Sequence, residues 1–397
     1  MTLPTHAQTA AVRTGLESDQ HHGAVVPPLH LSSNYTFAGF GSPRTYDYTR
    51  SGNPTRDTLA ETLTELEQGA GASVTASGMA AITLVCHLLS PGDTLVAPHD
   101  CYGGTFRLFR TLAEKGHFHV RFVDQTDAGA LEAALDPSVR LIWVETPSNP
   151  LLRVVDIAAV VAGARTVDAL VCVDNTFLSP ALQQPLTLGA DLVVHSTTKY
   201  LNGHSDVVGG AVVCRDRDLA NTVRDWSNNL GLTGAPFDAY LTLRGVRTLH
   251  ARMRSHEENA HALADLLDRD ERVLKVYYPG LEHSPFHALA NVQQSGFGGM
   301  ISFDLDTRHV CIRTFAESLR HFSLAESLGG VESLVCHPSS MTHAPLSAEA
   351  KAVAGIGEGL IRLSVGIERA DDLVADINEA LDRATREAAP TLRVASV

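Results

Sequence analysis

The sequence predicts an α/β protein in which a mostly parallel sheet lies between helices and a smaller α/β domain follows. Three observations support this prediction. Short apolar runs alternate with helical stretches between about residues 56 and 210, and this alternation is typical of βαβ units. Polar residues follow directly after several of the apolar runs. The 397 residues also suffice for two or three packed units.

Composition argues against several classes of protein. The 31 basic and 45 acidic residues give a net charge of −14, which disfavours nucleic acid or an anionic membrane as a partner. No apolar run has the length needed to cross a bilayer, and residues 1–23 lack the pattern of a signal peptide. The six cysteines show no CxxC spacing, so we expect reduced thiols and a cytoplasmic protein.

Residues 1–58 are expected to form an extended arm. They contain many turn residues and little amphipathic periodicity. Such an arm is best explained if it wraps around a neighbouring subunit, so we expect a homo-oligomer. The arm ends in YDYTRSGNPTR at 46–56, and its tyrosines and arginines are good donors to phosphates and carboxylates.

The elements of the sheet domain can be predicted in order. Helices are expected at 56–68, 78–89, 128–134 and 157–166, and strands at 73–76, 94–97, 118–123, 141–145, 170–174 and 191–195, with a last strand from Val207. Ligands of parallel sheets bind beyond the carboxyl ends of the strands. Glu145, Asp174 and the segment Ser196–Lys199 stand at such ends, so we expect them to converge.

The C-terminal third is predicted to form the smaller domain. Residues 237–268 form one long helical pattern that leads into it. Strands are expected at 273–277, 300–305 and 360–367, helices at 311–319 and 371–387, and a loose tail over the last ten residues. The predicted units are therefore the arm at 1–58, the sheet domain at 59–256 and the C-terminal domain at 257–397.

Lys199 stands shortly after an apolar strand, in DLVVHSTTKYLNGHSDVVGG at 191–210. Lysine prefers solvent, and burial lowers its pKa so that the neutral amine becomes a nucleophile. The hydroxyl groups of Ser196 and Thr198 can donate to phosphate oxygens. These features favour a lysine that forms a Schiff base with pyridoxal phosphate (PLP). The alternative is an ordinary lysine whose stem packs at the strand end.

A PLP site needs an amine, an anion opposite the pyridinium nitrogen, a stacking aromatic ring and a phosphate cup. We assign Lys199 as the amine, Asp174 as the anion and Tyr102 as the ring. The cup is assigned to Gly78, Met79, Ser196 and Thr198, because a helix beginning at Gly78 presents free N–H groups to an anion. Each residue has an ordinary structural explanation alone, but four matched roles in one topology favour PLP.

Arg362 lies inside the apolar strand predicted at 360–367. A buried arginine needs a partner, and the α-carboxylate of a substrate would accept two parallel hydrogen bonds from it. The alternative is an internal salt bridge. We expect no metal site, because His256 and His261 are five residues apart, whereas the HExxH motif needs a spacing of four.

Motifs along the whole chain resemble the Cys/Met-metabolism family of PLP enzymes. They are SGNPTRD at 51–57, ASGMAAI at 76–82, ETPSNP at 145–150, VDNTF at 173–177, HSTTKYLNGHSDVVGG at 195–210, AESLGGVESL at 325–334 and IRLSVGIE at 361–368. The resemblance implies the aspartate-aminotransferase-like type I fold and a homotetramer built as a dimer of dimers. It also implies that Tyr48 and Arg50 reach the PLP phosphate of the neighbouring subunit.

Three stretches resemble the cystathionine γ-synthases within this family: HLSSNYTFAGF at 30–40, Asp47 in YDYTR, and APHDCYGG at 97–104. This resemblance implies a transferase that converts O-succinyl-L-homoserine and L-cysteine into L-cystathionine and succinate. A cystathionine γ-lyase or a homoserine-ester sulfhydrylase is the alternative within the family. An interaction scaffold without catalysis is the alternative outside it.

The resemblance also implies roles for individual residues. Lys199 would move the substrate protons, with Tyr102 as a second acid and base. The residues expected to contact the substrate are Arg362, Ser327, Asn149, Glu326, Arg107 and Asp47.

Overall fold

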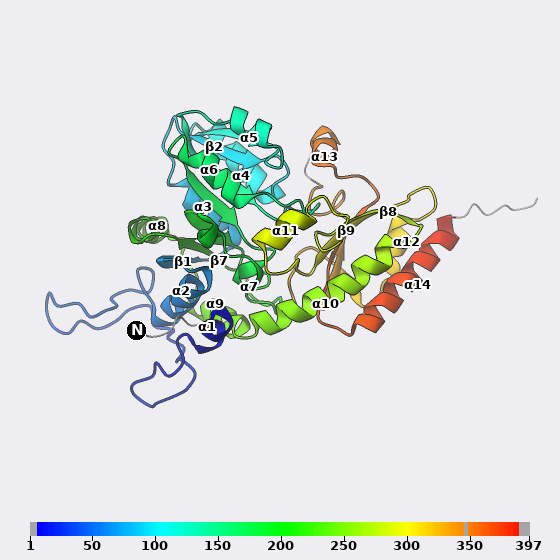
Figure 1. The fold of residues 1–397 in the computed structure, drawn as a ribbon. Helices are drawn as coiled ribbons and strands as arrows, with labels where there is room; N and C mark the ends of the chain where they lie inside the picture. Colours follow the sequence, from blue (N-terminus) through cyan, green and yellow to red (C-terminus); the bar gives the residue numbers. More distant parts are fainter. Residues whose placement is uncertain (1–5, 345–347, 389–397) are drawn as a thin grey trace, which may run out of the picture.

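The computed structural model describes residues 6–344 and 348–388, and it contains two sheets surrounded by helices (Figure 1). The tail predicted over the last ten residues lies outside the described residues except for its first residue. The predicted α/β architecture is confirmed.

The larger sheet has seven strands in the order β1-β7-β6-β5-β4-β2-β3. Its strands are β1 (Gly71–Thr75), β2 (Thr94–Pro98), β3 (His119–Val123), β4 (Val139–Glu145), β5 (Leu170–Asp174), β6 (Leu192–His195) and β7 (Gly210–Cys214). Strands β2 to β6 are parallel, whereas β7 runs antiparallel to β1 and β6. The last strand therefore begins at Gly210 and not at Val207, because Gly209 is held in the preceding loop by the Thr198 hydroxyl.

Helices cover both faces of this sheet. They are α2 (Pro54–Glu67), α3 (Gly78–Cys86), α4 (Gly103–Glu114), α5 (Ala128–Ala133), α6 (Ile157–Arg165), α7 (Ser179–Leu182) and α8 (Arg217–Leu230), with the 3₁₀ helix η1 at Pro185–Leu188. Val171 and Val173 pack in the core with α2 and α6, and Cys172 between them packs in the opposite core with α3 and α4. Burial on both faces explains why these strands are apolar throughout.

The prediction of one helix over 237–268 is wrong. The chain forms α9 (Pro236–Val246) and α10 (Leu249–Asp268), with a tight turn in which Thr248 N–H donates to the Gly245 carbonyl. Gly245 packs so closely against the carbonyl of Asn202 that a Cβ there would overlap it. Because this contact is tertiary, the apolar pattern continues through the break and does not reveal it.

The smaller sheet has the order β10-β11-β12-β9-β8. Its elements are β8 (Val273–Tyr277), α11 (His287–Gln293), β9 (Met300–Leu305), α12 (Ile312–Ser318), β10 (Phe322–Leu324), β11 (Ser333–Cys336), α13 (Ala348–Ala354), β12 (Leu360–Ser364) and α14 (Ala370–Ala388). Helices α10 and α14 run side by side along this domain (Figure 1). The domain boundary placed after residue 256 falls inside α10 and stays a prediction.

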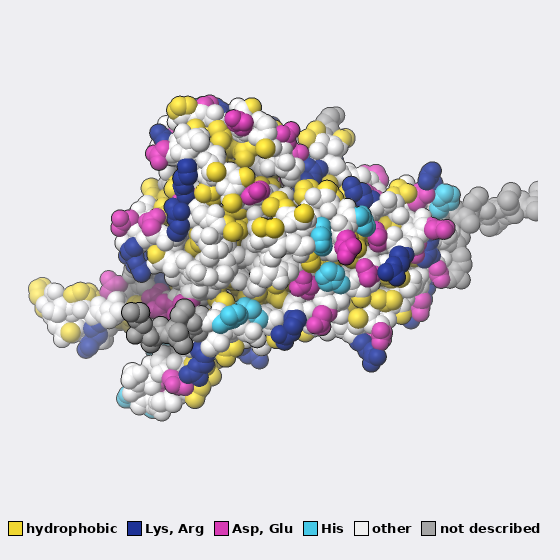
Figure 2. All heavy atoms as spheres, viewed as in Figure 1, with side chains coloured by type: hydrophobic (Ala, Val, Ile, Leu, Met, Phe, Trp, Pro, Cys, Tyr) yellow, Lys and Arg dark blue, Asp and Glu magenta, His cyan; other side chains and the backbone are white. Residues whose placement is uncertain are grey.

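The arm is not extended throughout. It begins with α1 (Ala7–Arg13), which was not predicted and which buries Ala10 and Ala11 against the core that contains α2. The rest of the arm projects from the body as long loops (Figure 1). Hydrophobic side chains lie at the tip of one loop (Figure 2). Phe37 and Phe40 of the arm are exposed. The contact with a neighbouring subunit stays a prediction.

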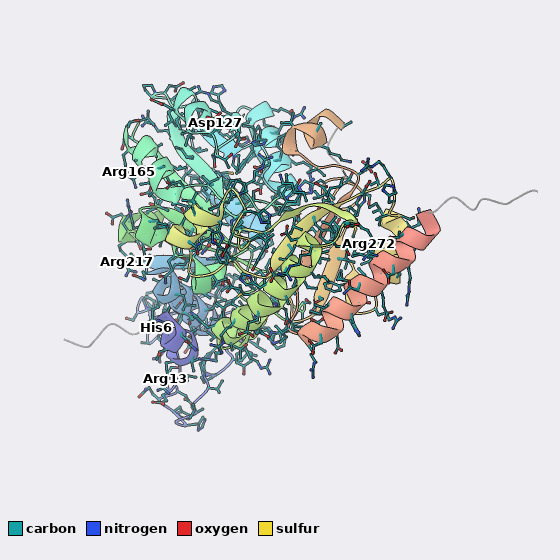
Figure 3. The ribbon with its side chains drawn as sticks, turned by 45° about the vertical axis from the view of Figure 1, so that its right-hand side comes forward. His6, Arg13, Asp127, Arg165, Arg217 and Arg272 are labelled. Atoms are coloured by element: carbon teal, nitrogen blue, oxygen red, sulfur yellow. The ribbon has the colours of Figure 1, made fainter. Side chains whose placement is uncertain are left out.

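An ion pair between the buried Asp191 and the partly exposed Arg165 anchors the strand that leads to Lys199. Asp191, which precedes β6, is almost fully buried and accepts hydrogen bonds from Arg165 at the end of α6, at distances of 2.9 and 3.1 Å. Arg165 is the last residue of α6 (Figure 3). The same carboxylate accepts the N–H of Val171 on β5. In the described ranges, no helix is long and apolar enough to span a membrane.

Candidate active site

Three neighbouring strands bring polar residues to one edge of the larger sheet. Glu145 ends β4 and stands directly beside Asp174, which ends β5. Asp174 in turn pairs with Val194, two residues before Ser196. The expected convergence at the carboxyl ends of the strands is therefore present in the fold.

The beginning of α3 forms a cradle with the segment that follows β6. Ser77 caps the helix by accepting the N–H of Ala80 at 3.0 Å, which leaves the N–H groups of Gly78 and Met79 without a partner inside the helix. A Cβ on Gly78 would stand 2.8 Å from the Cβ of Ser196. Only glycine therefore leaves room for an anion between the helix and Ser196.

Thr198 lies next to this cradle but is already engaged. Its Oγ1 accepts the N–H of Gly209 at 3.0 Å and lies 3.2 Å from the Gly209 carbonyl oxygen. Thr198 thus fixes the loop that follows Lys199, and its hydroxyl would have to turn to donate to a phosphate. Its role in the cup stays a prediction.

Lys199 is largely buried, and its Nζ donates to the Ser327 hydroxyl at 2.8 Å. Burial, together with the positive charge of Arg362, lowers its pKa from 10.5 to about 8, although Glu326 acts in the opposite direction. A substantial fraction of the amine is therefore neutral at physiological pH. This is the state that a nucleophilic lysine needs.

Arg362 lies beside Lys199 with only 2% of its surface exposed. Its Nη1 donates to the side-chain oxygen of Asn149 at 2.9 Å and its Nη2 to the Ser327 carbonyl at 3.0 Å. Both partners are neutral, and the buried Nε has no hydrogen-bond partner among the described residues. These contacts favour a carboxylate ligand over the internal salt bridge considered as the alternative.

Ser327 contacts both basic residues of the site, Lys199 and Arg362. Its backbone has φ of +95°, a conformation that is costly for a residue with a side chain. In this conformation its carbonyl reaches Arg362 while its hydroxyl reaches Lys199. Nothing in the sequence indicates this backbone conformation, since serine rarely adopts it.

Asp174 and Tyr102 both adjoin Glu145, because Asp174 stands in register with it and the Tyr102 N–H donates to its carboxyl group. The Asp174 carboxylate accepts the N–H of Thr176 at 3.0 Å; burial raises its pKa, and the hydrogen bonds from Thr176 and the proximity of His195 lower it. Tyr102 precedes α4, and a Cβ on Gly104 would stand 2.5 Å from its ring. The same Cβ would stand 3.0 Å from the Met79 sulfur, so Tyr102 and Met79 lie together.

Within one chain, the arm residues predicted for the site contact α8 and each other. Arg50 donates to Asn228 on α8 at 2.8 Å and lies 5.7 Å from the ring of Tyr48, and Asp47 accepts the Ser51 hydroxyl. The predicted contacts of Tyr48 and Arg50 with the PLP phosphate of a neighbouring subunit, and of Asp47 with the substrate, stay predictions. Arg107 is exposed on α4, near Gly103 at the helix start.

A buried polar cluster under the strand ends was not predicted. His195 Nε2 lies 2.6 Å from Glu67 Oε1, and both side chains are fully buried. Asn175 Nδ2 donates to the same Glu67 oxygen at 2.9 Å. The cluster ties α2 to the ends of β5 and β6. One signal was available, because Glu67 is a charged residue on the apolar face of its predicted helix.

Comparison with known proteins identifies the family. The sequence model of the Cys/Met metabolism PLP-dependent enzymes matches residues 8–382. The chain belongs to this family. It is 55% identical to cystathionine γ-synthase of Escherichia coli (95% of this chain, 98% of the relative) and 46% identical to cystathionine β-lyase of Lactococcus lactis subsp. cremoris (96% and 100%).

Comparison with a solved structure shows that this chain also shares the fold of the family. Cystathionine γ-synthase of Xanthomonas oryzae pv. oryzae, solved in complex with aminoacrylate and cysteine, is 60% identical over 96% of this chain and 99% of that chain, with a TM-score of 0.95. The type I fold expected from the resemblance is thereby confirmed.

The cofactor of this PLP-dependent family fits the site on two observations. The cradle that a Cβ on Gly78 would fill matches a phosphate, and the carboxylate of Asp174 matches a protonated pyridine nitrogen. Lys199 would then hold the cofactor covalently, with Tyr102 against its ring. These contacts stay assignments by geometry and chemistry.

The lowered pKa of Lys199 predicts how PLP capture by the apo-enzyme depends on pH. The neutral amine fraction falls about tenfold for each pH unit below a pKa of about 8, so the capture rate should rise steeply up to pH 8 and then level off. Stopped-flow absorbance measures this rate, and a free alkylamine under the same buffers corrects for the titration of PLP itself. A rate that keeps rising to about pH 10, as for an ordinary lysine, would contradict the prediction.

Proposed function

We propose that this chain is a cystathionine γ-synthase that replaces the succinyl group of O-succinyl-L-homoserine with L-cysteine and releases L-cystathionine and succinate. The geometry of Arg362 is the observation that supports an amino acid as the substrate. Its buried side chain has two neutral partners and lies beside Lys199. The higher identity to two γ-synthases, at 55% and 60%, than to the β-lyase, at 46%, supports γ-replacement.

The residues can be given definite tasks in this reaction. Bound PLP withdraws electrons from the α-carbon of an attached amino acid. Arg362 holds the substrate α-carboxylate, and Asn149 and Ser327 hold Arg362. Lys199 Nζ accepts the proton from Cα, passes it to Tyr102 as the second acid and base, and then accepts one from Cβ, which allows succinate to leave from Cγ. The cysteine thiolate then forms the new bond at Cγ, and Lys199 and Tyr102 return the two protons to Cβ and Cα.

The proposal extends to the surroundings of the site. Tyr102 serves as a second acid and base. Glu326, Arg107 and Asp47 contact the distal carboxylate or the amine of the substrates. The enzyme acts in methionine biosynthesis, as a cytoplasmic homotetramer in which the arm of one subunit completes the site of the next.

A lyase that cleaves cystathionine is the second candidate, because the chain is also 46% identical to a cystathionine β-lyase over nearly its whole length. A lyase would use the same lysine and the same arginine. The two functions differ in what they do with cystathionine, as product or as substrate.

Parallel assays of the purified holoenzyme test the proposal. We expect cystathionine and succinate from O-succinyl-L-homoserine plus cysteine, with a kcat/KM at least about tenfold above that for cystathionine cleavage. Assays with the acetyl and phosphoryl esters compare the leaving groups, and sulfide in place of cysteine tests for a sulfhydrylase. Faster formation of a 2-oxo acid from cystathionine than of cystathionine from its precursors would contradict the proposal.

A further inference from the structure

Glu145 is a buried carboxyl group for which the reaction above has no task. It ends β4 with 6% of its surface exposed and stands in register with Asp174 on β5. Its Oε2 accepts the backbone N–H of Tyr102 at 2.9 Å. The backbone N–H of Asn149 faces this carboxyl group as well and acts to lower its pKa. One side chain thus contacts or adjoins three residues assigned to the site.

Two neighbouring carboxyl groups in a buried site cannot both be ionised at low cost. Burial raises the pKa of Asp174 too, but the hydrogen bonds from Thr176 and the nearby His195 act against this rise and favour the anion. Glu145 also faces backbone N–H groups, but two further acids, Asp174 and Asp100, act against its ionisation. Burial, and next the charge of Asp174, raise its pKa well above the usual range.

The other acid near Glu145 has its own partners. Asp100 accepts the Ser148 hydroxyl at 3.0 Å and lies 3.6 Å from the Arg153 guanidinium. Its negative charge also acts against ionisation of Glu145. Of the two adjoining carboxyl groups, Glu145 and Asp174, we therefore expect Glu145 to be the protonated one.

The backbone of Tyr102 depends on this contact. No side chain caps the beginning of α4, where Tyr102 occupies the N-cap position. The Tyr102 N–H donates to Glu145, and a neutral carboxylic acid can still accept this bond through its carbonyl oxygen. Without an acceptor, this N–H would lose its partner at the wall of the site.

We propose that Glu145 is a positioning residue whose neutral carboxylic acid ties Tyr102 and Asn149 to the end of β4. Through them it sets the aromatic ring and the partner of Arg362 relative to each other. It also leaves Asp174 as the single negative charge opposite the pyridine nitrogen. The inference rests on Tyr102 and Asp174 as PLP contacts and not on which amino-acid reaction follows.

Two substitutions of Glu145 test whether a neutral hydrogen-bond acceptor is what this position needs. Glu145→Gln keeps a neutral group with an acceptor oxygen, so the Kd of the apo-enzyme for PLP should stay within about twofold. Glu145→Leu has a similar volume but no acceptor, so the Kd should rise about tenfold or more. The visible circular dichroism band of bound PLP should also change in the leucine variant, because Tyr102 is no longer held. Both measurements need no substrate, so their outcome is independent of the proposed reaction.

Gln125→Leu is the matched control. Gln125 is equally buried and donates to the carbonyl of Trp143, two residues before Glu145 on the same strand. This substitution should lower the Tm without changing the Kd for PLP or the circular dichroism band. A leucine variant at Glu145 that behaves in the same way would overturn the proposal, since the role would then be structural only.

The glutamine variant keeps the proposal testable if the leucine variant does not fold. PLP binding by Glu145→Gln that is tenfold weaker than wild type would show that the anion is needed, and would overturn the proposal. Infrared spectroscopy gives a second measurement. The carbonyl stretch of a buried carboxylic acid should be present in the wild-type protein and absent from Glu145→Gln. Its absence from the wild type would also overturn the proposal.

Discussion

Replacing Lys199 with alanine is expected to lower kcat/KM by at least about 10⁴-fold and to remove the absorbance band of lysine-bound PLP. The reason is that one amine has two tasks, to hold the cofactor covalently and to move the substrate protons. Its lowered pKa and its hydrogen bond to Ser327 fit both tasks. The variant should still bind PLP, but without a covalent bond and more weakly.

Two further variants make this result specific. Lys199→Arg keeps a positive charge but cannot form the covalent bond, so it should be as inactive as the alanine variant. Lys275→Ala removes an exposed lysine of the C-terminal domain that lies over the ring of Tyr277, and should be fully active. Borohydride reduction of the holoenzyme followed by peptide mass spectrometry should locate the cofactor on Lys199. A yellow and fully active Lys199→Ala enzyme would contradict the assignment of Lys199 as the PLP-binding lysine.

The position of the site could be predicted from the sequence because it depends on local order. Parallel strands present their carboxyl ends at one edge of the sheet, so polar residues directly after apolar runs must converge there. Glu145, Asp174 and Ser196 follow this rule. The start of α3 at Gly78 could be predicted for the same reason, since a strand, a Ser-Gly turn and an apolar helix follow each other in the chain.

What could not be predicted depends on tertiary contacts. The break between α9 and α10 arises where Gly245 meets the backbone of Asn202, and the apolar pattern continues through it. The positive φ of Ser327 belongs to a residue type that rarely adopts it. The task of the Thr198 hydroxyl depends on Gly209 in the next turn. Such contacts leave no periodic signal in a sequence.

Replacing Arg362 with alanine is expected to raise the KM for the homoserine ester about 100-fold, or about 2.7 kcal/mol, with a smaller change in kcat. The guanidinium is buried, and its two hydrogen-bonded partners carry no negative charge. It can therefore give its full charge and a two-pronged hydrogen bond to the substrate α-carboxylate. Arg362→Lys should recover only part of the affinity, because an ammonium group lacks the planar fork.

The pH profile provides an independent test of the same arginine. Its positive charge disfavours the protonated form of Lys199 and so lowers the pKa of that lysine. Without this charge the lysine pKa rises, so the acidic limb of PLP capture by the apo-enzyme should move to higher pH in Arg362→Ala. The limb should stay in place in Arg362→Lys, which keeps the charge. An unchanged KM in Arg362→Ala would place the carboxylate elsewhere, whereas a raised KM with an unmoved limb would separate carboxylate binding from the tuning of Lys199.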